Sequence, residues 1–250
     1  MDYRKMYLKS EEVLMLLQEA LNKKQPFSLI RIGDGEGRVI AHDLLFPTDS
    51  ISPVKRERLL YAGARLPDYK LQKKLIWSMK NADVVGFSGV EGPGGYPLLS
   101  EILKSEKVPV FLDDFNLICS AYINMIFWKR GYWPKIWDDK NLLVIGRRAE
   151  EAIKKDVFKN TREVFAASIE GFNSLEGTLI RIEKIDFDLA LVSAGVVAPI
   201  ICSFLARLRK KVAFDFGHLL DCILEPDLTP GEIRIKQKRI WEEKRGEKKW

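Results

Sequence analysis

Two acidic side chains follow a short apolar segment near the N-terminus, in the stretch SLIRIGDGEG at residues 28–37. Gly33 and Gly35 lie on either side of Asp34 and permit a tight turn, and Glu36 follows directly. Asp-x-Glu on such a turn can direct two hard oxygen ligands at one Mg²⁺ or Mn²⁺. A diphosphate beside two carboxylates would be strongly disfavoured unless a cation lay between them. The pattern therefore predicts a divalent cation held by Asp34 and Glu36; the alternative is that both acids are solvated turn residues.

The common phosphate-binding motifs do not account for this turn. In the pattern G-x-G-x-x-G, Gly33 and Gly35 fit, but Arg38 occupies the third glycine position. The sequence also has no G-x-x-x-x-G-K-[ST] loop. Arg31 alternates with apolar neighbours in the preceding segment, which favours a position facing a bound phosphate. An ion pair to an acid of the same loop is the alternative for Arg31.

A second candidate turn lies in DLALVSAGVVAPII at residues 188–201, where an apolar segment ends in small residues before a helical pattern. Ser193, Ala194 and Gly195 would leave backbone N–H groups open at the start of a helix, which is a favourable place for an anion. Close packing of helix and strand through small side chains is the alternative, and the two are compatible.

His218 is one of two histidines and lies in DFGHLLD at residues 215–221, between Asp215 and Asp221. It could donate a hydrogen bond to a phosphate or a sugar hydroxyl, or approach the metal. The alternative is a structural histidine whose hydrogen bonds are satisfied within the fold. We interpret His42, which lies on the predicted helix after the first turn, as structural.

Short apolar segments alternate with segments of helical length along most of the chain, which is typical of a parallel sheet wrapped by helices. We therefore predict an α/β fold with a Rossmann-like, mostly parallel sheet flanked by helices. The predicted strands are 27–32, 83–89, 108–114, 141–146, 163–168, 188–195 and 211–217. The predicted helices are 10–24, 37–45, 53–66, 70–79, 149–158 and 197–210, and the aromatic-rich segment 116–137 also has helical length.

Ligands of such folds bind outside the carboxyl ends of the strands. Polar residues fall at several of these predicted ends: Asp34 and Glu36, Ser88 and Gly89, Asp113 and Asp114, Gly146 to Arg148, Ser193 to Gly195, and Asp215 to His218. Their convergence predicts one site at this edge of the sheet, with Arg147 and Arg148 as further candidates for a phosphate contact.

The charge of the chain is concentrated at its C-terminus. Residues 231–250 hold eight Lys or Arg and four Asp or Glu, a net of +4, so the other 230 residues hold +2 of the total +6. We therefore predict a single domain at 1–225 and a basic tail at 226–250.

Binding of nucleic acid would need a basic face across the folded domain, and we expect no such partner. The tail, with Trp241 and Trp250 among lysines, could contact an anionic membrane surface or a partner; a solvated charged helix is the alternative.

Targeting and redox features indicate a cytoplasmic protein, with the tail allowing peripheral contact at the inner face of a membrane. No apolar run reaches the ~20 residues of a membrane span. The N-terminus has acids within its apolar part and lacks a signal-peptide cleavage pattern. Cys119, Cys202 and Cys222 form no C-x-x-C pair and lie in apolar contexts, so we expect buried free thiols.

Two segments of the chain resemble the bacterial GT-D-type glycosyltransferases. RIGDGEG is similar to their RFGDGE-type segment, whose DxE motif serves metal-dependent transfer from a nucleotide-sugar. LALVSAGVVAPIICSFLARLRKKVAFDFGHLLD resembles their strand, GPTA-like turn, helix and strand ending in D-x-G-H. The similarity spans residues 10–221 in the same order. Ser193 to Val196 replace the GPTA-like turn, and LLDCIL replaces the acid-and-aromatic run expected after the histidine.

The resemblance implies a hexosyltransferase-type enzyme that uses Mn²⁺ or Mg²⁺ to move a sugar from a nucleotide-diphosphate sugar, a UDP-sugar, to a glycan or glycoprotein acceptor. By this resemblance, catalysis is assigned to Asp34, Glu36, Asp215 and His218, with the metal on Asp34 and Glu36. Nucleotide-sugar binding is assigned to Arg31, Gly33, Gly35, Ser193, Ala194 and Gly195. The base is open among Asp215, Asp221 and His218, and a homo-oligomer is compatible with all of this. The alternative function is a non-catalytic nucleotide- or phosphosugar-binding module.

Overall fold

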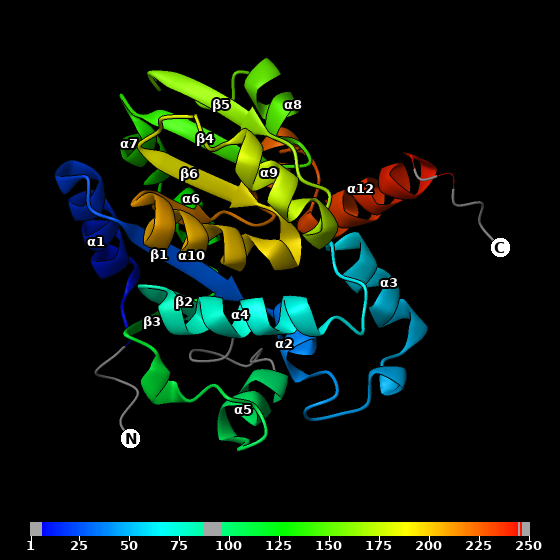
Figure 1. Ribbon diagram of the computed structural model, residues 1–250. Helices are drawn as coiled ribbons and strands as arrows, with labels where there is room; N and C mark the ends of the chain where they lie inside the picture. The colour runs from blue at the N-terminus through cyan, green and yellow to red at the C-terminus, as the bar shows by residue number, and fades with distance from the viewer. Residues whose placement is uncertain (1–6, 88–96, 245, 247–250) are drawn as a thin grey trace.

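Seven parallel strands form one sheet in the computed structural model, which describes residues 7–87, 97–244 and 246. The order across the sheet is β3-β2-β1-β7-β6-β4-β5, and every neighbouring pair is parallel. The strands are β1 (Phe27–Ile32), β2 (Val84–Phe87), β3 (Leu117–Ser120), β4 (Asn141–Gly146), β5 (Glu163–Ala167), β6 (Leu189–Ser193) and β7 (Val212–Asp215). The predicted α/β class with a parallel sheet is confirmed. In Figure 1 the arrowheads point toward the side of the molecule where the C-terminal helix lies.

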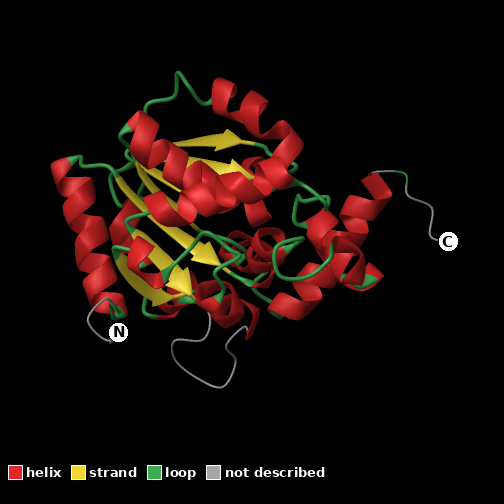
Figure 2. Ribbon diagram, turned by 60° about the horizontal axis from the view of Figure 1, so that its bottom comes forward, coloured by secondary structure: helices red, strands yellow, loops and turns green. Residues whose placement is uncertain are grey.

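Helices cover both faces of the sheet, as Figure 2 shows from a second direction. One face packs against α2 (Asp34–Ala41), α4 (Tyr69–Asn81), α5 (Pro97–Lys104), α9 (Leu175–Arg181) and α10 (Ala198–Arg209). The other packs against α1 (Ser10–Lys23), α6 (Ile123–Lys129), α7 (Trp133–Trp137), α8 (Ala149–Lys154) and α11 (Leu219–Leu224). The remaining helices are α3 (Pro53–Tyr61), α12 (Pro230–Lys244) and the short turns η2 (Thr48–Ser50), η3 (Leu112–Asp114), η4 (Phe172–Ser174) and η5 (Gly195–Val197).

The central position of β1 explains its apolar sequence. Ile30 and Ile32 are fully buried in the core on the α10 side, and Leu29 is fully buried on the α1 side. A parallel strand covered on both faces needs apolar residues at successive positions rather than at alternate ones. Arg31, which interrupts this run, lies at the carboxyl end of the strand, next to β2 and β7.

One predicted strand is wrong. Residues 108–114 form a loop and η3, and the third strand is β3, which pairs in register with β2 from Leu117 opposite Val84. Pro109 cannot donate a ladder hydrogen bond, and the Phe111 N–H donates to the Asp114 carboxylate instead, at 2.8 Å. Asp113 and Asp114 therefore precede a strand and do not lie at a carboxyl end. Ser88 and Gly89 lie outside the described residues.

The aromatic-rich segment 116–137 is not one helix. It contains β3, α6 and α7, with Gly131 in a left-handed conformation (φ +66°) between the two helices. The Phe127 and Trp133 side chains are fully buried and pack against Phe214 of β7, with ring centroids 5.9 and 4.8 Å away. The segment thus supplies both an edge strand and much of the core on the α1 side.

The C-terminal segment predicted as a tail contains α12, which packs on the rest of the chain. Its Trp241 is buried, with its ring perpendicular to that of Tyr61 at 5.7 Å, and Lys238 pairs with Glu57 at 2.8 Å. Figure 1 shows α12 beside α3. Trp241 is therefore not presented to a membrane surface, and Trp250 lies outside the described residues. The domain boundary at residue 225 stays a prediction.

Two further expectations concern membranes and thiols. Among the helices that the structure describes, none combines the length and the apolar character that crossing a bilayer requires. Cys119 and Cys202 are buried free thiols, as predicted, and Cys222 is a half-buried one. Burial raises the pKa of the Cys119 thiol to about 12, which removes its thiolate at neutral pH.

Candidate active site at the carboxyl edge of the sheet

The two acids of the DxE segment lie in the first turn of α2, which starts at Asp34 rather than at residue 37. Glu36 folds back so that its carboxylate accepts the Gly33 N–H at 2.9 Å. The Asp34 carboxylate forms an ion pair with Arg38, one turn along the helix. Acidic side chains are common in the first turn of a helix, because the N–H groups there lack partners within the helix. Asp34 and Glu36 thus have different protein partners.

Arg31 binds the end of the neighbouring strand β7 rather than an acid of its own loop. Its Nε donates to the Asp215 carbonyl oxygen and its Nη2 to Asp215 Oδ1, each at 2.9 Å, while its backbone N–H donates to Asp215 Oδ2 at 3.2 Å. Its Nη1 donates to the Ala121 carbonyl oxygen, just after β3, at 3.2 Å. One guanidinium therefore connects the carboxyl ends of β1, β7 and β3.

Gly217 packs directly against the Arg31 guanidinium. The residue has φ +54°, and a Cβ placed on it would lie 1.7 Å from Arg31 Nη2, so no other residue type fits without displacing Arg31. Its carbonyl oxygen accepts the hydroxyl of Ser193 at 2.7 Å. The end of β6 is thereby attached to the same cluster, with the Ser193 side chain directed at Gly217.

The electrostatics of this cluster are dominated by two carboxyl groups near one guanidinium. Burial raises the pKa of Glu36, and the negative charge of Asp215 raises it further. Burial also raises the pKa of Asp215, an effect that the hydrogen-bonded Arg31 opposes. With both acids ionised, Glu36, Asp215 and Arg31 carry a net negative charge, which a bound cation would balance.

The carboxylates of Asp34 and Glu36 fit an Mg²⁺ or Mn²⁺ ion whose other coordination positions are filled by water and by oxygen atoms of a bound substrate. Within residues 7–87, 97–244 and 246, no group of three or more His, Cys, Asp or Glu side chains could hold a metal ion. Mg²⁺ is usually bound through one or two carboxylates together with water and substrate phosphates, so two hard oxygen donors from α2 meet this need. The side chain of Asp34 is 44% exposed and is thus open to such a ligand.

The turn after β6 is packed tightly against the end of α3. Gly195 has φ +56°, and a Cβ on it would lie 2.3 Å from the Ala62 carbonyl oxygen. That same oxygen accepts the Val196 N–H at 3.1 Å, so this N–H is not open to an anion. Gly195 is exposed and Ala194 half-exposed. The close-packing interpretation of the small residues therefore holds.

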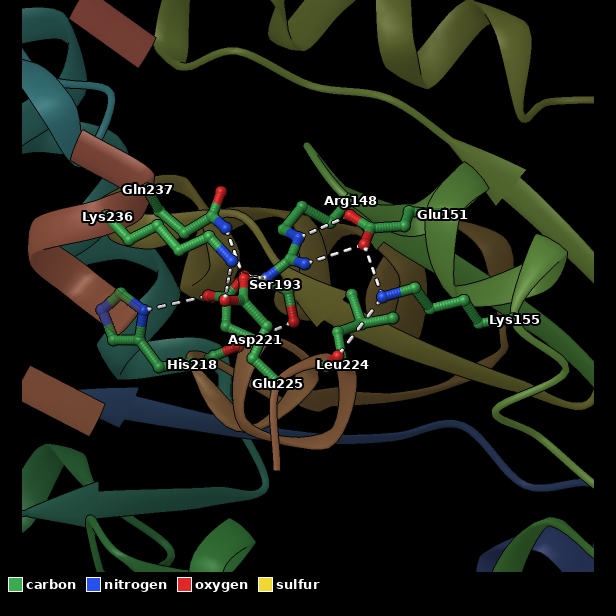
Figure 3. A network of polar contacts seen from close by, with 11 residues as sticks. Arg148, Glu151, Lys155, Ser193, His218, Asp221, Leu224, Glu225, Lys236 and Gln237 are labelled. Carbon is green, nitrogen blue, oxygen red and sulfur yellow. Dashed lines mark hydrogen bonds and ion pairs between the residues drawn. The ribbon is translucent and has the colours of Figure 1, made fainter. Parts of the chain in front are cut away.

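His218 lies at the start of α11 and is largely exposed. Its side chain is 60% exposed, and Nδ1 lies 3.4 Å from Asp221 Oδ2. Asp221 in turn accepts a hydrogen bond from Arg148 Nη1 at 3.3 Å. Figure 3 shows His218 directed toward Asp221 at one side of this network. The imidazole is thus oriented by one carboxylate and open to solvent on its other side.

Arg148 is the centre of that network. It pairs with Glu151 at 2.7 Å and with Glu225 at 2.7 Å in addition to Asp221, as Figure 3 shows. Glu225 is buried and also binds Lys236 at 2.5 Å and the side-chain amide of Gln237 at 2.6 Å, both from α12. The guanidinium is therefore bound by three carboxylates of the protein itself and ties α12 to the carboxyl end of β4.

Arg147 has a different set of partners. Its guanidinium lies over the Tyr61 ring, 4.7 Å from the centroid, and pairs with Glu170 at 3.2 Å. His42, interpreted as structural, is fully buried; its Nε2 accepts the Asp68 N–H at 3.3 Å and its ring stacks on Tyr69. That interpretation is confirmed.

A family model described as a GT-D fold-like domain matches residues 8–223, which is most of the chain. The chain belongs to the GT-D-like family. The match includes the β1–α2 turn, the turn after β6 and the end of β7, and it stops before α12. No curated protein and no solved structure matches the chain. The resemblance drawn from the two sequence segments is thereby confirmed at the level of the family.

In this GT-D-like chain, the geometry brings four of the predicted site residues together and reveals a network that sequence reasoning missed. Arg31, Asp215 and Glu36 interact directly or electrostatically, and Ser193 joins them through Gly217. The contacts of Arg148 with Asp221 and Glu225 connect residues more than 70 positions apart. No local pattern signals them, because the partners become neighbours only when β4, β6 and β7 assemble.

Proposed function

We propose that this GT-D-like protein is a metal-dependent glycosyltransferase that transfers a sugar from a nucleotide-diphosphate sugar, a UDP-sugar, to a glycan or glycoprotein acceptor. The observation that carries the proposal is the set of acids at adjacent strand ends, Asp34 and Glu36 after β1 and Asp215 of β7. The charge of Asp215 raises the pKa of Glu36, so these two groups share one electrostatic environment. Such an excess of negative charge attracts a divalent cation, and the cation in turn allows a diphosphate to bind beside the carboxylates.

The residues at this edge of the sheet have different proposed roles. Asp34 and Glu36 would hold Mn²⁺ or Mg²⁺, which when bound neutralises charge on the departing diphosphate. Arg31 and Gly217 fix Asp215 and the end of β7 in place. His218, exposed and oriented by Asp221, is the group best placed to accept the proton of an acceptor hydroxyl. Asp215 is hydrogen-bonded to Arg31 at both carboxylate oxygens and so acts as a positioning residue.

Isothermal titration of UDP and of UDP-sugars, with Mn²⁺ or with EDTA, tests the proposal. We expect the metal to tighten binding at least about tenfold, which corresponds to about 1.4 kcal/mol. Asp34→Asn and Glu36→Gln should each abolish that gain. Asp49→Asn, which removes an exposed carboxylate in η2, is the matched control and should bind as the wild type does. Equal affinity with and without metal, together with no hydrolysis of any UDP-sugar, would refute the transferase function.

A non-catalytic nucleotide-binding module is the second candidate. It is favoured by the protein partners that Asp34 and Glu36 already have, Arg38 and the Gly33 N–H. Such a module would bind nucleotide without metal, and its affinity would survive both acid substitutions. The same titrations therefore separate the two functions.

A further inference from the structure

Tyr122 has an exposed aromatic ring at the carboxyl edge of the sheet. The residue is 56% exposed, although its chain neighbours Ala121 and Ile123 are buried. It follows β3 and comes directly before α6. Exposing this much aromatic surface gains little of the stabilisation that burial of a tyrosine ring gives, so packing does not explain the residue.

The backbone around Tyr122 is held on both sides. The Ala121 carbonyl oxygen accepts Arg31 Nη1 at 3.2 Å, and the Ala121 N–H donates to the Phe87 carbonyl oxygen at 2.9 Å. On the other side, the Asn124 side-chain amide donates to the Phe216 carbonyl oxygen, just past β7, at 2.8 Å. Residues 121–124 are thus hydrogen-bonded at one end to the Arg31 side chain of β1 and at the other to Phe216, just past β7. Tyr122 belongs to a segment that is fixed at both ends.

Two buried aromatic residues of this segment have ring partners that Tyr122 lacks. Phe127 and Trp133 are packed ring against ring in the core. Tyr69, exposed to a similar degree elsewhere, donates its hydroxyl to Asp43 and stacks on His42. Within the described part of the chain, no ring contact or side-chain hydrogen bond involves the Tyr122 side chain. Because the backbone here is already held, stacking on a ligand would require the ordering of this one side chain and not of the segment that carries it.

We propose that Tyr122 is the stacking platform for the nucleobase of the nucleotide-sugar donor, an inference that rests on the proposed function. The acids that would hold the metal and diphosphate follow β1, and β3 lies two strands away, which at ~4.8 Å per strand is about 10 Å. A ribose separates the diphosphate from the base, so the base must lie beside the metal site and not on it. The Arg31–Ala121 hydrogen bond joins the two positions through one side chain.

Titration of wild type, Tyr122→Ala and Tyr122→Phe with UDP alone and with a UDP-sugar, in Mn²⁺, tests this role. We expect Tyr122→Ala to weaken binding of both ligands by about 5- to 150-fold, as loss of one base-stacking contact does, and Tyr122→Phe to bind as the wild type does. In turnover, the alanine variant should raise KM and leave kcat unchanged. Its thermal unfolding should match that of the wild type, because the ring is exposed.

Trp128→Ala is the matched control. Trp128 is 40% exposed on α6, six residues after Tyr122 and so about 9 Å further along the helix axis, and its removal should not change the affinity for UDP. Unchanged UDP binding by Tyr122→Ala would overturn the inference while leaving the transferase function intact. Weaker binding of the UDP-sugar but not of UDP would also overturn it, since the ring would then contact the sugar. Failure of the wild type to bind any nucleotide would overturn both.

Discussion

Arg31 of β1 and Asp215 of β7 form a bidentate contact in which Nη2 and Nε of the arginine bind the carboxylate and the carbonyl of the aspartate, each at 2.9 Å. The side chains are only 19% and 5% exposed, so neither charge is well solvated. The pair joins two adjacent strands at the edge where the acids of α2 lie. It is therefore the element that holds the candidate site together.

Removal of one member of this pair should be costly. We expect Arg31→Met or Asp215→Asn to lower the free energy of unfolding by about 3 kcal/mol each, because each leaves a buried charge without its partner. The double variant should lose less than the sum of the two, with a coupling of about 1–3 kcal/mol. Urea unfolding of the four proteins measures this. Strictly additive losses would show that the contact does not stabilise the fold.

Substitution of Gly217 tests how closely the backbone approaches Arg31. Gly217→Ala adds a methyl group 1.7 Å from Arg31 Nη2 at φ +54°, so both strain and displacement of the guanidinium are expected. We predict a loss of at least about 2 kcal/mol in unfolding free energy, together with weaker nucleotide binding.

Gly131→Ala is the matched control for this substitution. Gly131 has φ +66° but no atom within 4 Å of an added Cβ, so only backbone strain of about 1 kcal/mol is expected. Equal losses in the two alanine variants would mean that Arg31 is not held by Gly217.

The sequence predicted the parallel sheet and the strand ends at which the candidate site residues lie, for reasons that can be traced to particular residues. The run FSLIRI is apolar because β1 is buried on both faces, and the acids after it lie where a parallel sheet places its ligands. The pattern did not reveal β3, because VPVFL has more strand character than LICS. Residues 108–112 nevertheless form no strand. Pro109 has no N–H to donate to a neighbouring strand, and the Phe111 N–H donates to the Asp114 carboxylate instead.

The partners of the site residues could not be predicted from local patterns. Arg31 was expected to face a phosphate or bind an acid of its own loop, and its partner Asp215 comes from a strand 184 residues later. The basic C-terminus was expected to be a tail, yet Trp241 and Lys238 bind α3. These contacts depend on strand order and on helix docking, which the periodicity of apolar residues does not specify.

Glu151 gives the network around Arg148 a measurable pH dependence. Hydrogen bonds from Arg148 lower the pKa of Glu151 to about 2. A carboxyl group whose pKa is lower in the folded than in the unfolded state stabilises the fold above its unfolded pKa, near 4.3, and this stabilisation disappears as the pH falls toward 2. Since the side chain is partly solvated, we expect Glu151→Gln to cost only about 0.5–1 kcal/mol at pH 7.

Thermal unfolding of Glu151→Gln and wild type between pH 7 and pH 2 measures this effect. The two curves should differ at pH 7 and converge between pH 4.3 and 2. Glu150→Gln, at the adjacent exposed position of α8, serves as the control and should follow the wild type throughout. A difference that persists unchanged at pH 2 would contradict the assigned role.

Docking of α12 can be tested at the aromatic contact with α3. We expect Trp241→Ala to lower the free energy of unfolding and to release α12 locally, because a buried ring perpendicular to Tyr61 is lost. Limited proteolysis and hydrogen exchange of residues 230–244 measure the release. Ile235→Ala, which shortens a 65% exposed side chain on the same helix, should leave both unchanged. Wild-type protection of α12 in the Trp241 variant would refute the docking contact.

The release of UDP from UDP-sugars by the purified protein, with Mn²⁺ and without added acceptor, tests the central claim most directly. Slow, metal-dependent hydrolysis of at least one UDP-sugar is predicted for the wild type, with loss of this activity in Asp34→Asn and Glu36→Gln and retention in Asp49→Asn. Release that is the same in EDTA, or that survives both acid substitutions, would contradict the assignment of the metal and the diphosphate to the first turn of α2.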